Sequence, residues 1–270
     1  MSPIAPKKKY GQNFLTTPDI PQKIVRMAGV TKDMFVIEIG PGKGIMTKEL
    51  AKEAFAVTAL EIDTSLRDTL EQELTPFPNV NVVYGDIMET DINKLVTMFS
   101  EGRKALVVAN IPYYITSPLI MKLLYETNSV SGAVLMVQKE VALRMTALPG
   151  TADYSAFTIA IQQKAKADKL FSVKRGCFFP VPKVDSAVVR LTVFDEPQFI
   201  PKDEKLFNAL VTASFMQRRK TFVNAASSVA DKAILTHILN ICGLSPDIRG
   251  EALSITQFCE IADILSTVQR

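Results

Sequence analysis

The residues of this chain best suited to chemistry are Asn110, Ile111, Pro112 and Tyr113. They directly follow the apolar run 105–109, which predicts a buried strand. The side-chain carbonyl of Asn110 and the backbone carbonyl of Ile111 can together accept both hydrogens of an amino group on a flat ring. Pro112 fixes φ and removes a competing donor, and Tyr113 offers a face for stacking. The segment therefore predicts a site for an amine-bearing ring, although an ordinary strand-to-helix turn has similar residues.

A glycine-rich turn follows an earlier apolar segment. Residues 34–39 predict a strand, residues 40–44 read Gly-Pro-Gly-Lys-Gly, and residues 45–52 predict a helix. Strand, glycine turn and helix in this order are typical of the start of a doubly wound α/β sheet. The spacing G-x-G-x-G differs from the G-x-G-x-x-G of NAD sites. The turn therefore predicts close approach of the backbone to a ligand other than a dinucleotide.

Two further predicted strands lead into acidic residues. Residues 56–60 end at Glu61, whose carboxylate can accept both hydrogen bonds of a ribose diol. Residues 80–84 are followed by Asp86, which can accept a hydrogen bond from an adenine amino group. Because ligands of such sheets lie outside the carboxyl ends of the strands, we expect these residues to line one crevice with Gly40 and Asn110. A ribose and an adenine without a phosphate cradle indicate S-adenosylmethionine, with S-adenosylhomocysteine as the product.

The rest of the chain completes a sheet and then changes character. Residues 117–125 predict a helix, and residues 132–138, 167–173 and 185–193 predict three more strands, with an amphipathic segment at 139–148. Two prolines in residues 195–203 interrupt the strand pattern, and residues 204–270 are helical in character. The prediction is an α/β domain at 1–194 with a mostly parallel, seven-stranded, Rossmann-like sheet, a linker at 195–203 and a small all-α domain at 204–270.

Composition excludes several classes of protein. A net charge of +3 is too mild to indicate a nucleic-acid partner by itself. Three cysteines without a C-x-x-C pair, and a single histidine at His237, predict neither a disulfide framework nor a metal site. No stretch reaches the roughly 18 apolar residues of a membrane helix, and no apolar signal core follows the basic N-terminus. The sequence predicts a cytoplasmic protein.

Three other segments each leave two interpretations open. Lys7, Lys8 and Lys9 precede Asn13 and Leu15, so this region is either a solvated tail or an arm that touches phosphates and closes over a small ligand. In the segment 217–220, the cations Arg218, Arg219 and Lys220 form either a solvated face or a phosphate contact, since cations at a helix start are disfavoured by the dipole. In the loop 174–183, Phe178 is either a stacking face opposite Tyr113 or an aromatic plug in the core.

Taken together, the motifs resemble those of the ribosomal RNA small-subunit adenine dimethyltransferases. The resemblance extends over nearly the whole chain and rests on six segments: 11–15 (GQNFL), 38–42 (EIGPG), 110–113 (NIPY), 138–141 (QKEV), 182–191 (PKVDSAVVRL) and 217–221 (QRRKT). It implies a class I S-adenosylmethionine-dependent fold. It also implies that the donor is contacted by Asn13, Leu15, Gly40, Gly42, Glu61, Asp86 and Asn110.

The same resemblance implies the reaction. The expected substrate is a pair of adjacent adenosines in a hairpin near the 3′ end of 16S ribosomal RNA, each dimethylated at N6 by a monomeric enzyme that acts on the immature small subunit and needs no metal. Asn110, Tyr113 and Phe178 are the expected catalytic residues, and Lys7, Lys8, Lys9, Arg218, Arg219 and Lys220 the expected RNA contacts. A role in assembly of the small subunit beside the chemistry stays open.

Some residues depart from the family pattern, and some rivals remain. Tyr114 stands where Asn is common, Ser155 where Gly is frequent, and Val181 interrupts a proline run. The 23S ribosomal RNA dimethyltransferases of macrolide resistance share Asn-Ile-Pro-Tyr and are the nearest rival. A non-catalytic binding factor on the same scaffold is a second rival, and a dehydrogenase is opposed by the glycine spacing.

Overall fold

The computed structural model describes residues 7–268, without the side chain of Lys8. Contacts divide the chain into two units. The first holds the chain up to Ala142 together with Ala165–Asp195, and the second holds Leu143–Lys164 together with the chain from Glu196 onward. Each unit therefore contains two separate stretches of sequence.

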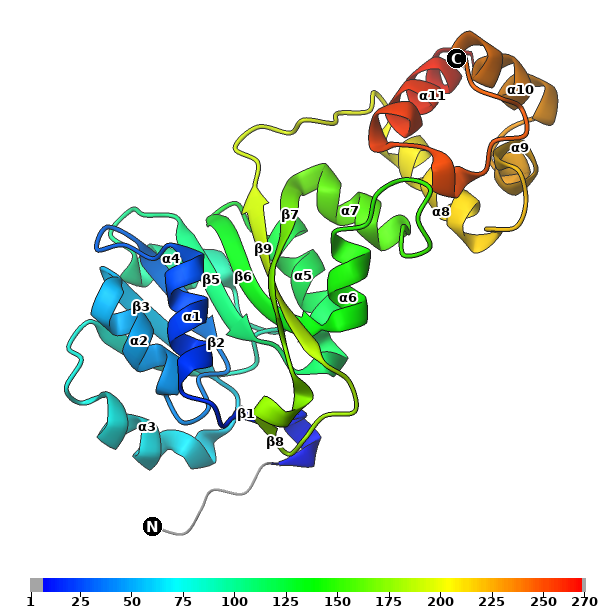
Figure 1. Ribbon diagram of the computed structural model, residues 1–270. Coiled ribbons are helices and arrows are strands. Elements are labelled where there is room, and N and C mark those ends of the chain that lie inside the picture. Colours follow the sequence, from blue (N-terminus) through cyan, green and yellow to red (C-terminus); the bar gives the residue numbers. More distant parts are fainter. Residues whose placement is uncertain (1–6, 269–270) are drawn as a thin grey trace. The chain divides into compact units, whose positions relative to one another are not determined.

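The first unit is organised around a seven-stranded sheet (Figure 1). The strand order is β4-β3-β2-β5-β6-β9-β7, and only β9 runs antiparallel to its neighbours. The strands are β2 (Phe35–Ile39), β3 (Ala56–Glu61), β4 (Val80–Tyr84), β5 (Ala105–Asn110), β6 (Val130–Gln138), β7 (Ala165–Val173) and β9 (Ser186–Val193). The predicted mostly parallel seven-stranded sheet is confirmed.

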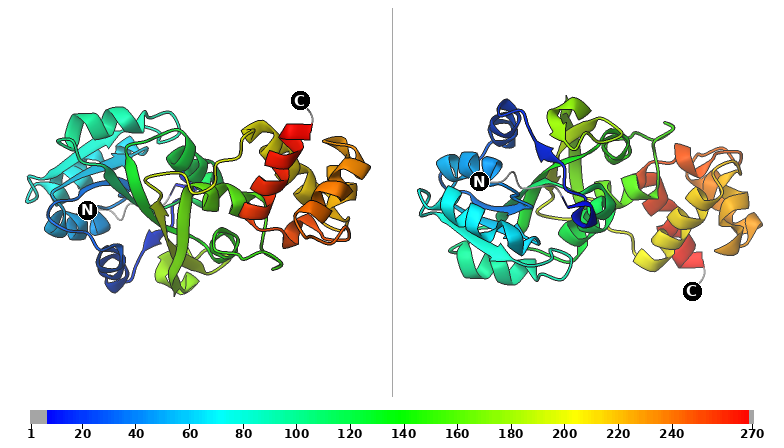
Figure 2. Two further views of the ribbon diagram at one scale, coloured as in Figure 1. Left: turned by 90° about the horizontal axis from the view of Figure 1, so that it is seen from above. Right: turned by 90° about the horizontal axis from the view of Figure 1, so that it is seen from below.

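Helices cover both faces of this sheet (Figure 2). They are α1 (Asp19–Ala28), α2 (Ile45–Glu53), α3 (Arg67–Leu74), α4 (Ile92–Phe99) and α5 (Thr116–Tyr125). Ile24 of α1 and Leu50 of α2 pack with Val36, Val57 and Val108, which alternate with residues of the opposite face. Because β2 is covered on both sides, all five of its residues are buried. Two 3₁₀ turns directly precede helices: η2 (Thr64–Leu66) precedes α3, and η3 (Tyr113–Ile115) precedes α5.

A second, two-stranded sheet joins distant parts of the first unit. Strand β1 (Phe14–Leu15) pairs antiparallel with β8 (Phe178–Phe179), so Phe14 lies opposite Phe179 and Leu15 opposite Phe178. Thr16 continues the connection, because its backbone N–H and its hydroxyl both donate to the carbonyl of Cys177. Residues 7–16, which include the 3₁₀ turn η1 (Lys8–Tyr10), are called the arm below. The sequence did not predict this pairing.

The second unit is helical and contains a stretch that the sequence assigned to the first domain. Its helices are α7 (Ala156–Lys164), α8 (Glu204–Met216), α9 (Phe222–Ala225), α10 (Lys232–Ile241) and α11 (Ile255–Val268), and α6 (Lys139–Met145) crosses from one unit to the other. Phe207, Phe222 and Phe258 form the centre of its core. Tyr154 and Ile159 are buried in the same cluster, and the Tyr154 hydroxyl donates to the Leu253 carbonyl at 3.0 Å. Residues 143–164 group with the second unit because these side chains complete its core.

Candidate active site

One cavity lies at the carboxyl ends of β2, β3 and β5. It is lined by the glycine turn after β2, by Glu61 at the end of β3, by residues 110–112 after β5 and by residues 10–15 of the arm. Six of the predicted donor contacts therefore meet in one place: Asn13, Leu15, Gly40, Gly42, Glu61 and Asn110. The parallel register of β2 with β3 and with β5 brings them together, because it aligns the ends of the three strands.

The glycine turn requires glycine at two cavity-lining positions. Gly40 and Gly42 have φ values of 71° and 58°, in the left-handed region that other residues rarely adopt. A Cβ at Gly40 would meet no atom within 4 Å, so the cavity leaves room at the backbone for a ligand. A Cβ at Gly42 would lie 3.0 Å from a ring carbon of Phe14, so this glycine also lets the arm approach.

Glu61 is buried and held by the backbone. Its Oε2 accepts the N–H of Gly42 at 3.1 Å, and its Oε1 accepts the N–H of Asp63 at 2.9 Å. Burial raises the pKa of Glu61, and the hydrogen bonds from the backbone oppose that shift. Each oxygen has a second lone pair, so the carboxylate is fixed in position and still able to accept the two hydroxyls of a ribose.

A second buried carboxylate, Glu38, also lines the cavity, and sequence reasoning did not assign it a role. It is 1% exposed, and among the described residues neither of its oxygens has a hydrogen-bond partner. Burial raises its pKa to about 8, the nearby Thr47 hydroxyl opposes the shift, and Glu61 adds to it. An unpaired buried acceptor is costly unless a ligand satisfies it. The signal in the sequence was an acidic residue inside the otherwise apolar strand 35–39.

Asn110 is oriented by the arm. Its side-chain nitrogen donates to the backbone carbonyl of Asn13 at 3.1 Å. Because that carbonyl can only accept, the amide nitrogen must face Asn13, and the amide oxygen faces away from it. Ile111 follows with its N–H bound to the Met136 carbonyl at 3.2 Å, so the turn after β5 is fixed to β6. The amide oxygen is therefore not engaged by Asn13, on a residue that lines the cavity.

Tyr113 lies in η3, just beyond the residues that line the cavity. Its hydroxyl is 2.9 Å from the hydroxyl of Ser186, the first residue of β9. Burial raises the pKa of Tyr113, and the contact with Ser186 opposes that shift. The ring is half-buried and held by this contact, which suits a fixed stacking face.

Two predicted site residues lie elsewhere. Asp86 is not among the residues that line the cavity, and its Oδ1 accepts the N–H of Met88 at 2.8 Å in the turn after β4. Phe178 is 2% exposed and packs in the core with Val173 and Val188, whereas its neighbour Phe179 is 60% exposed. Of the two interpretations of Phe178, the structure has the aromatic plug, because alternate residues of β8 point to opposite sides.

The predicted RNA contacts also differ from one another. Lys7 forms an ion pair with Asp63 at 2.7 Å, and Lys9 is exposed with its Nζ 4.4 Å from the centre of the Tyr10 ring. The side chain of Lys8 lies outside the described part of the structure.

In the second unit only Arg218 of the cation cluster has an internal role. Its Nε donates to Glu251 at 3.0 Å and its Nη2 forms an ion pair with the same carboxylate oxygen at 3.0 Å, and Nη2 donates to the Ala152 carbonyl at 2.9 Å. Arg219 and Lys220 are exposed. Arg218 therefore ties parts of this unit together, and the two residues after it remain accessible to an external anion.

Residues 7–268 contain no group of three or more His, Cys, Asp or Glu side chains placed to hold a metal ion. No helix among them is long and apolar enough to cross a membrane.

Comparison with known proteins gives consistent matches over nearly the whole chain. A family model described as "Ribosomal RNA adenine dimethylase" matches residues 5–267. Proteins named "Ribosomal RNA small subunit methyltransferase A" are similar: that of Caldanaerobacter subterraneus is 44% identical over 96% of this chain and 97% of its own length, and that of Geobacillus thermodenitrificans is 42% identical over 98% and 92%.

Solved structures are similar at lower identity. A dimethyladenosine transferase from Plasmodium falciparum has a TM-score of 0.81 at 27% identity and covers 95% of this chain and 98% of its own. The 23S rRNA methyltransferase ErmE has a TM-score of 0.75 at 27% identity, over 94% and 100%. The fold of a sheet domain followed by helices is thus common to these proteins.

Proposed function

The chain belongs to the ribosomal RNA adenine dimethylase family, and we propose that it dimethylates N6 of two adjacent adenosines in a hairpin near the 3′ end of small-subunit (16S) ribosomal RNA. It is an S-adenosylmethionine-dependent methyltransferase, as its family is. The names of the two relatives support the small-subunit substrate. This chain is 42–44% identical to them and 27% identical to the 23S enzyme.

The cavity fits the methyl donor on grounds of its own chemistry. Gly40 leaves space beside the backbone, Glu61 holds two acceptor oxygens ready for a ribose diol, and Glu38 is a buried acceptor without a partner among the described residues. We assign Glu38 to a cationic group of the donor, since that contact would remove the cost of its burial. Asn13, Leu15 and Gly42 also line the cavity. Asp86 lies outside the lining, and we assign its Oδ2 to the adenine amino group in the bound state, since its Oδ1 accepts the N–H of Met88.

One observation carries the proposal: Asn110 lines the cavity and is held through its amide nitrogen, which leaves its oxygen to accept from a ligand. That oxygen and the Ile111 carbonyl accept the two hydrogens of the target amine and aim its lone pair at the donor. S-adenosylmethionine supplies a methyl group on a sulfonium, which is a good leaving group. Positioning supplies most of the acceleration in such a reaction, so none of the residues at the cavity needs to act as a general base.

The target adenosine has to leave its stack before it reaches Asn110. Extrusion costs a few kcal/mol, and less in a hairpin loop. Stacking on Tyr113 returns ~1–3 kcal/mol, which nearly balances that cost. Phe178 joins in only if it leaves the core, and the exposed Phe179 is the other aromatic that β8 offers. A loop adenosine is therefore a suitable substrate and one inside a stable duplex is not.

Asn110→Ala tests the proposal. We expect methyl transfer to fall by about 10²-fold or more, because the amine is no longer held, while thermal unfolding stays unchanged. The measurement is nucleoside mass spectrometry of small subunits that lack the modification, with naked 23S RNA assayed beside them. Near-normal turnover in the variant would reject the assignment of Asn110. Preferential methylation of 23S RNA would favour the rival substrate.

The exposed cations of the second unit are proposed to bind RNA phosphate. Replacement of Arg219 and Lys220 by Ala should reduce the dependence of RNA affinity on salt by about one to two counterions, since each phosphate contact releases about 0.7–0.9 of one. Arg218→Ala is the matched comparison, because this side chain is bound to Glu251. An unchanged salt dependence in the Arg219/Lys220 variant would remove the role. As a protein of small-subunit maturation, the chain is expected to act as a monomer in the cytoplasm.

A further inference from the structure

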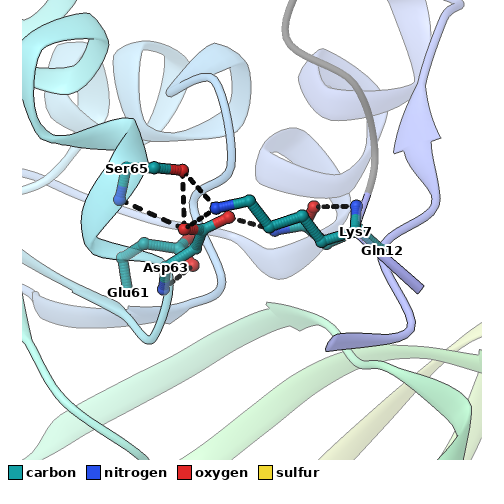
Figure 3. A network of polar contacts seen from close by, with 5 residues as sticks. All are labelled: Lys7, Gln12, Glu61, Asp63 and Ser65. Atoms are coloured by element: carbon teal, nitrogen blue, oxygen red, sulfur yellow. Dashed lines mark hydrogen bonds and ion pairs between the residues drawn. The ribbon is translucent and has the colours of Figure 1, made fainter. Parts of the chain in front are cut away.

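Asp63 receives more hydrogen bonds than its place in the chain requires. It precedes η2, and accepting the N–H of Ser65 at 3.1 Å is enough to cap that turn. It also accepts from Lys7 Nζ at 2.7 Å on Oδ1 and from Gln12 Nε2 at 3.3 Å on Oδ2 (Figure 3). The Ser65 hydroxyl donates to Oδ1 as well, at 2.7 Å, so the donors from outside the turn are the two of the arm.

The carboxylate is suited to hold these donors firmly. The side chain of Asp63 is 4% exposed, so its ion pair with Lys7 is better shielded from water than a surface pair. Burial raises the pKa of Asp63, but hydrogen bonds from Lys7, Ser65 and Gln12 outweigh it and hold the pKa at about 2. Asp63 is therefore charged at every physiological pH.

The arm is closed on itself at the same point. The backbone N–H of Lys7 donates to Gln12 Oε1 at 2.8 Å, while the other end of that amide donates to Asp63. Gln12 is thus fixed in position and orientation. The next residue is Asn13, whose carbonyl holds the amide nitrogen of Asn110. A continuous series of contacts therefore runs from Asp63 through Gln12 to Asn110.

The far end of the arm is fixed as well, by the pairing of β1 with β8 and by the bonds from Thr16 to Cys177. Between these two attachments, residues 10–15 form one wall of the cavity. The cavity measures about 110 Å³, below the roughly 300–1,000 Å³ of sites that enclose a drug-sized ligand. The arm is the part of the lining best able to move when the donor binds or leaves, because side chains and a two-residue ladder hold it instead of a sheet.

We propose that Asp63 anchors the arm as a latch: with Lys7 and Gln12 bound to it, the arm retains the methyl donor and turns the amide oxygen of Asn110 toward the amine. Asp63 and Lys7 are positioning residues that act through Gln12 and Asn13. The part that concerns the amine rests on the proposed function, whereas retention of the donor does not.

The experiment uses four full-length variants: Asp63→Asn, Lys7→Met, the two combined, and Asp91→Asn as the matched control. Asp91 also caps a helix with its carboxylate, accepting the N–H of Lys94 at 3.1 Å, and is not bonded to the arm. Asn keeps the capping acceptor at either position. Binding of S-adenosylmethionine and of S-adenosylhomocysteine is measured by calorimetry without RNA. Single-turnover methylation is then measured at saturating donor.

We expect Asp63→Asn and Lys7→Met each to weaken binding of both ligands about five- to tenfold, within the range usual for coupled sites. The combined variant should be no weaker than the weaker single one, because both changes remove the same contact. Asp91→Asn should stay within about twofold of the parent, well under the 1.4 kcal/mol of a tenfold change. At saturating donor the two latch variants should still transfer methyl more slowly, with RNA affinity unchanged, because Asn110 is no longer oriented.

Donor affinities in the latch variants equal to that of Asp91→Asn would overturn the proposal. So would a Lys7→Met variant that loses RNA affinity and keeps donor affinity, since Lys7 would then be a phosphate contact. If Asp63→Asn does not fold, Lys7→Met decides, because the Lys7 side chain is 37% exposed and the fold depends less on it. Failure of the proposed function would appear differently. The parent protein would not methylate ribosomal RNA, while the latch variants would still bind the donor more weakly than the parent and Asp91→Asn do.

Discussion

The two walls of the cavity are made in different ways. One wall consists of the ends of parallel strands, where Gly40, Glu61 and Asn110 are fixed by the register of β2, β3 and β5. The other wall is the arm, which is attached by β8 and by Asp63. Strand ends are positioned by a core buried on both faces, whereas the arm depends on a few polar contacts. The first wall is preformed, and the second is the one able to open.

The largest expected effect comes from removing the buried ring of Phe178, which supports the strand that the arm pairs with. Phe178→Ala should lower the free energy of unfolding by about 3–5 kcal/mol, because it leaves a cavity under β8. Phe179→Ala, at an exposed position of the same strand, should cost under about 0.5 kcal/mol. Scanning calorimetry measures both. A stable Phe178→Ala protein that fails to methylate RNA would show that the residue stacks on substrate instead.

Replacing the buried carboxyl group of Glu38 tests whether the strand wall is preformed. The pKa of Glu38 is about 8 in the folded protein against 4.5 ordinarily, so the folded state keeps a proton that the unfolded chain releases. Stability therefore falls as pH rises from about 4.5 to about 8. Glu38→Gln should remove the contribution of Glu38 to this slope and be the more stable protein at pH 8, by roughly 2–4 kcal/mol. Its donor affinity should fall at the same time.

Unfolding at pH 5.5 and pH 8 measures the slope, and calorimetry measures the affinity. Parallel pH profiles for the parent and Glu38→Gln would mean that another group holds the proton. Unchanged donor affinity would remove Glu38 from the donor site.

The contact between the two walls is tested at Gly42. Gly42→Ala should cost about 1–2 kcal/mol of stability for its left-handed backbone and, by pushing Phe14 away, weaken donor binding about tenfold (1.4 kcal/mol). Gly29→Ala is the control: its φ is 69° and its Cβ would meet nothing within 4 Å. It should show the same loss of stability with donor affinity intact. Equal affinities in the two variants would show that the arm does not depend on Gly42.

The smallest expected effect concerns the edge of the strand wall. Asp86→Asn keeps the acceptor for Met88 and replaces the second oxygen by a donor. Loss of one hydrogen bond to adenine should weaken donor binding about fivefold, or roughly 1 kcal/mol. Titration calorimetry with S-adenosylhomocysteine measures it. An affinity within error of the parent would place Asp86 outside the site in the bound state too.

The sequence predicted the strand wall well and the arm poorly, for physical reasons. Apolar runs ending in Gly40, Glu61 and Asn110 identify strand ends, and a parallel sheet brings such ends together without further information. The bond between Lys7 and Asp63 joins residues far apart in sequence and has no local pattern. The pairing of β1 with β8 involves two residues on each strand, too few for a periodicity to appear.

Two other features were missed because partners outside their own segment decide them. The sequence predicted Tyr154 in the sheet domain. In the structure it is buried with Phe207 and Phe258, and residues 143–164 belong to the helical unit. The apolar residues around Glu38 predict a buried strand, and this pattern does not show that the carboxyl group has no partner. Local patterns report strands and turns, and they do not report which distant side chain fills a core or leaves a carboxylate unpaired.

The division of the second unit into two stretches has a consequence for how the protein is made. When residues 143–164 are synthesised, Phe207, Phe222 and Phe258 have not yet been added to the chain. Tyr154 therefore lacks these packing partners while β7 and β9 are added to the sheet. The sheet can therefore form before the core of the helical unit does. Residues 143–164, the first part of that unit to be synthesised, pack only after the later helices are present.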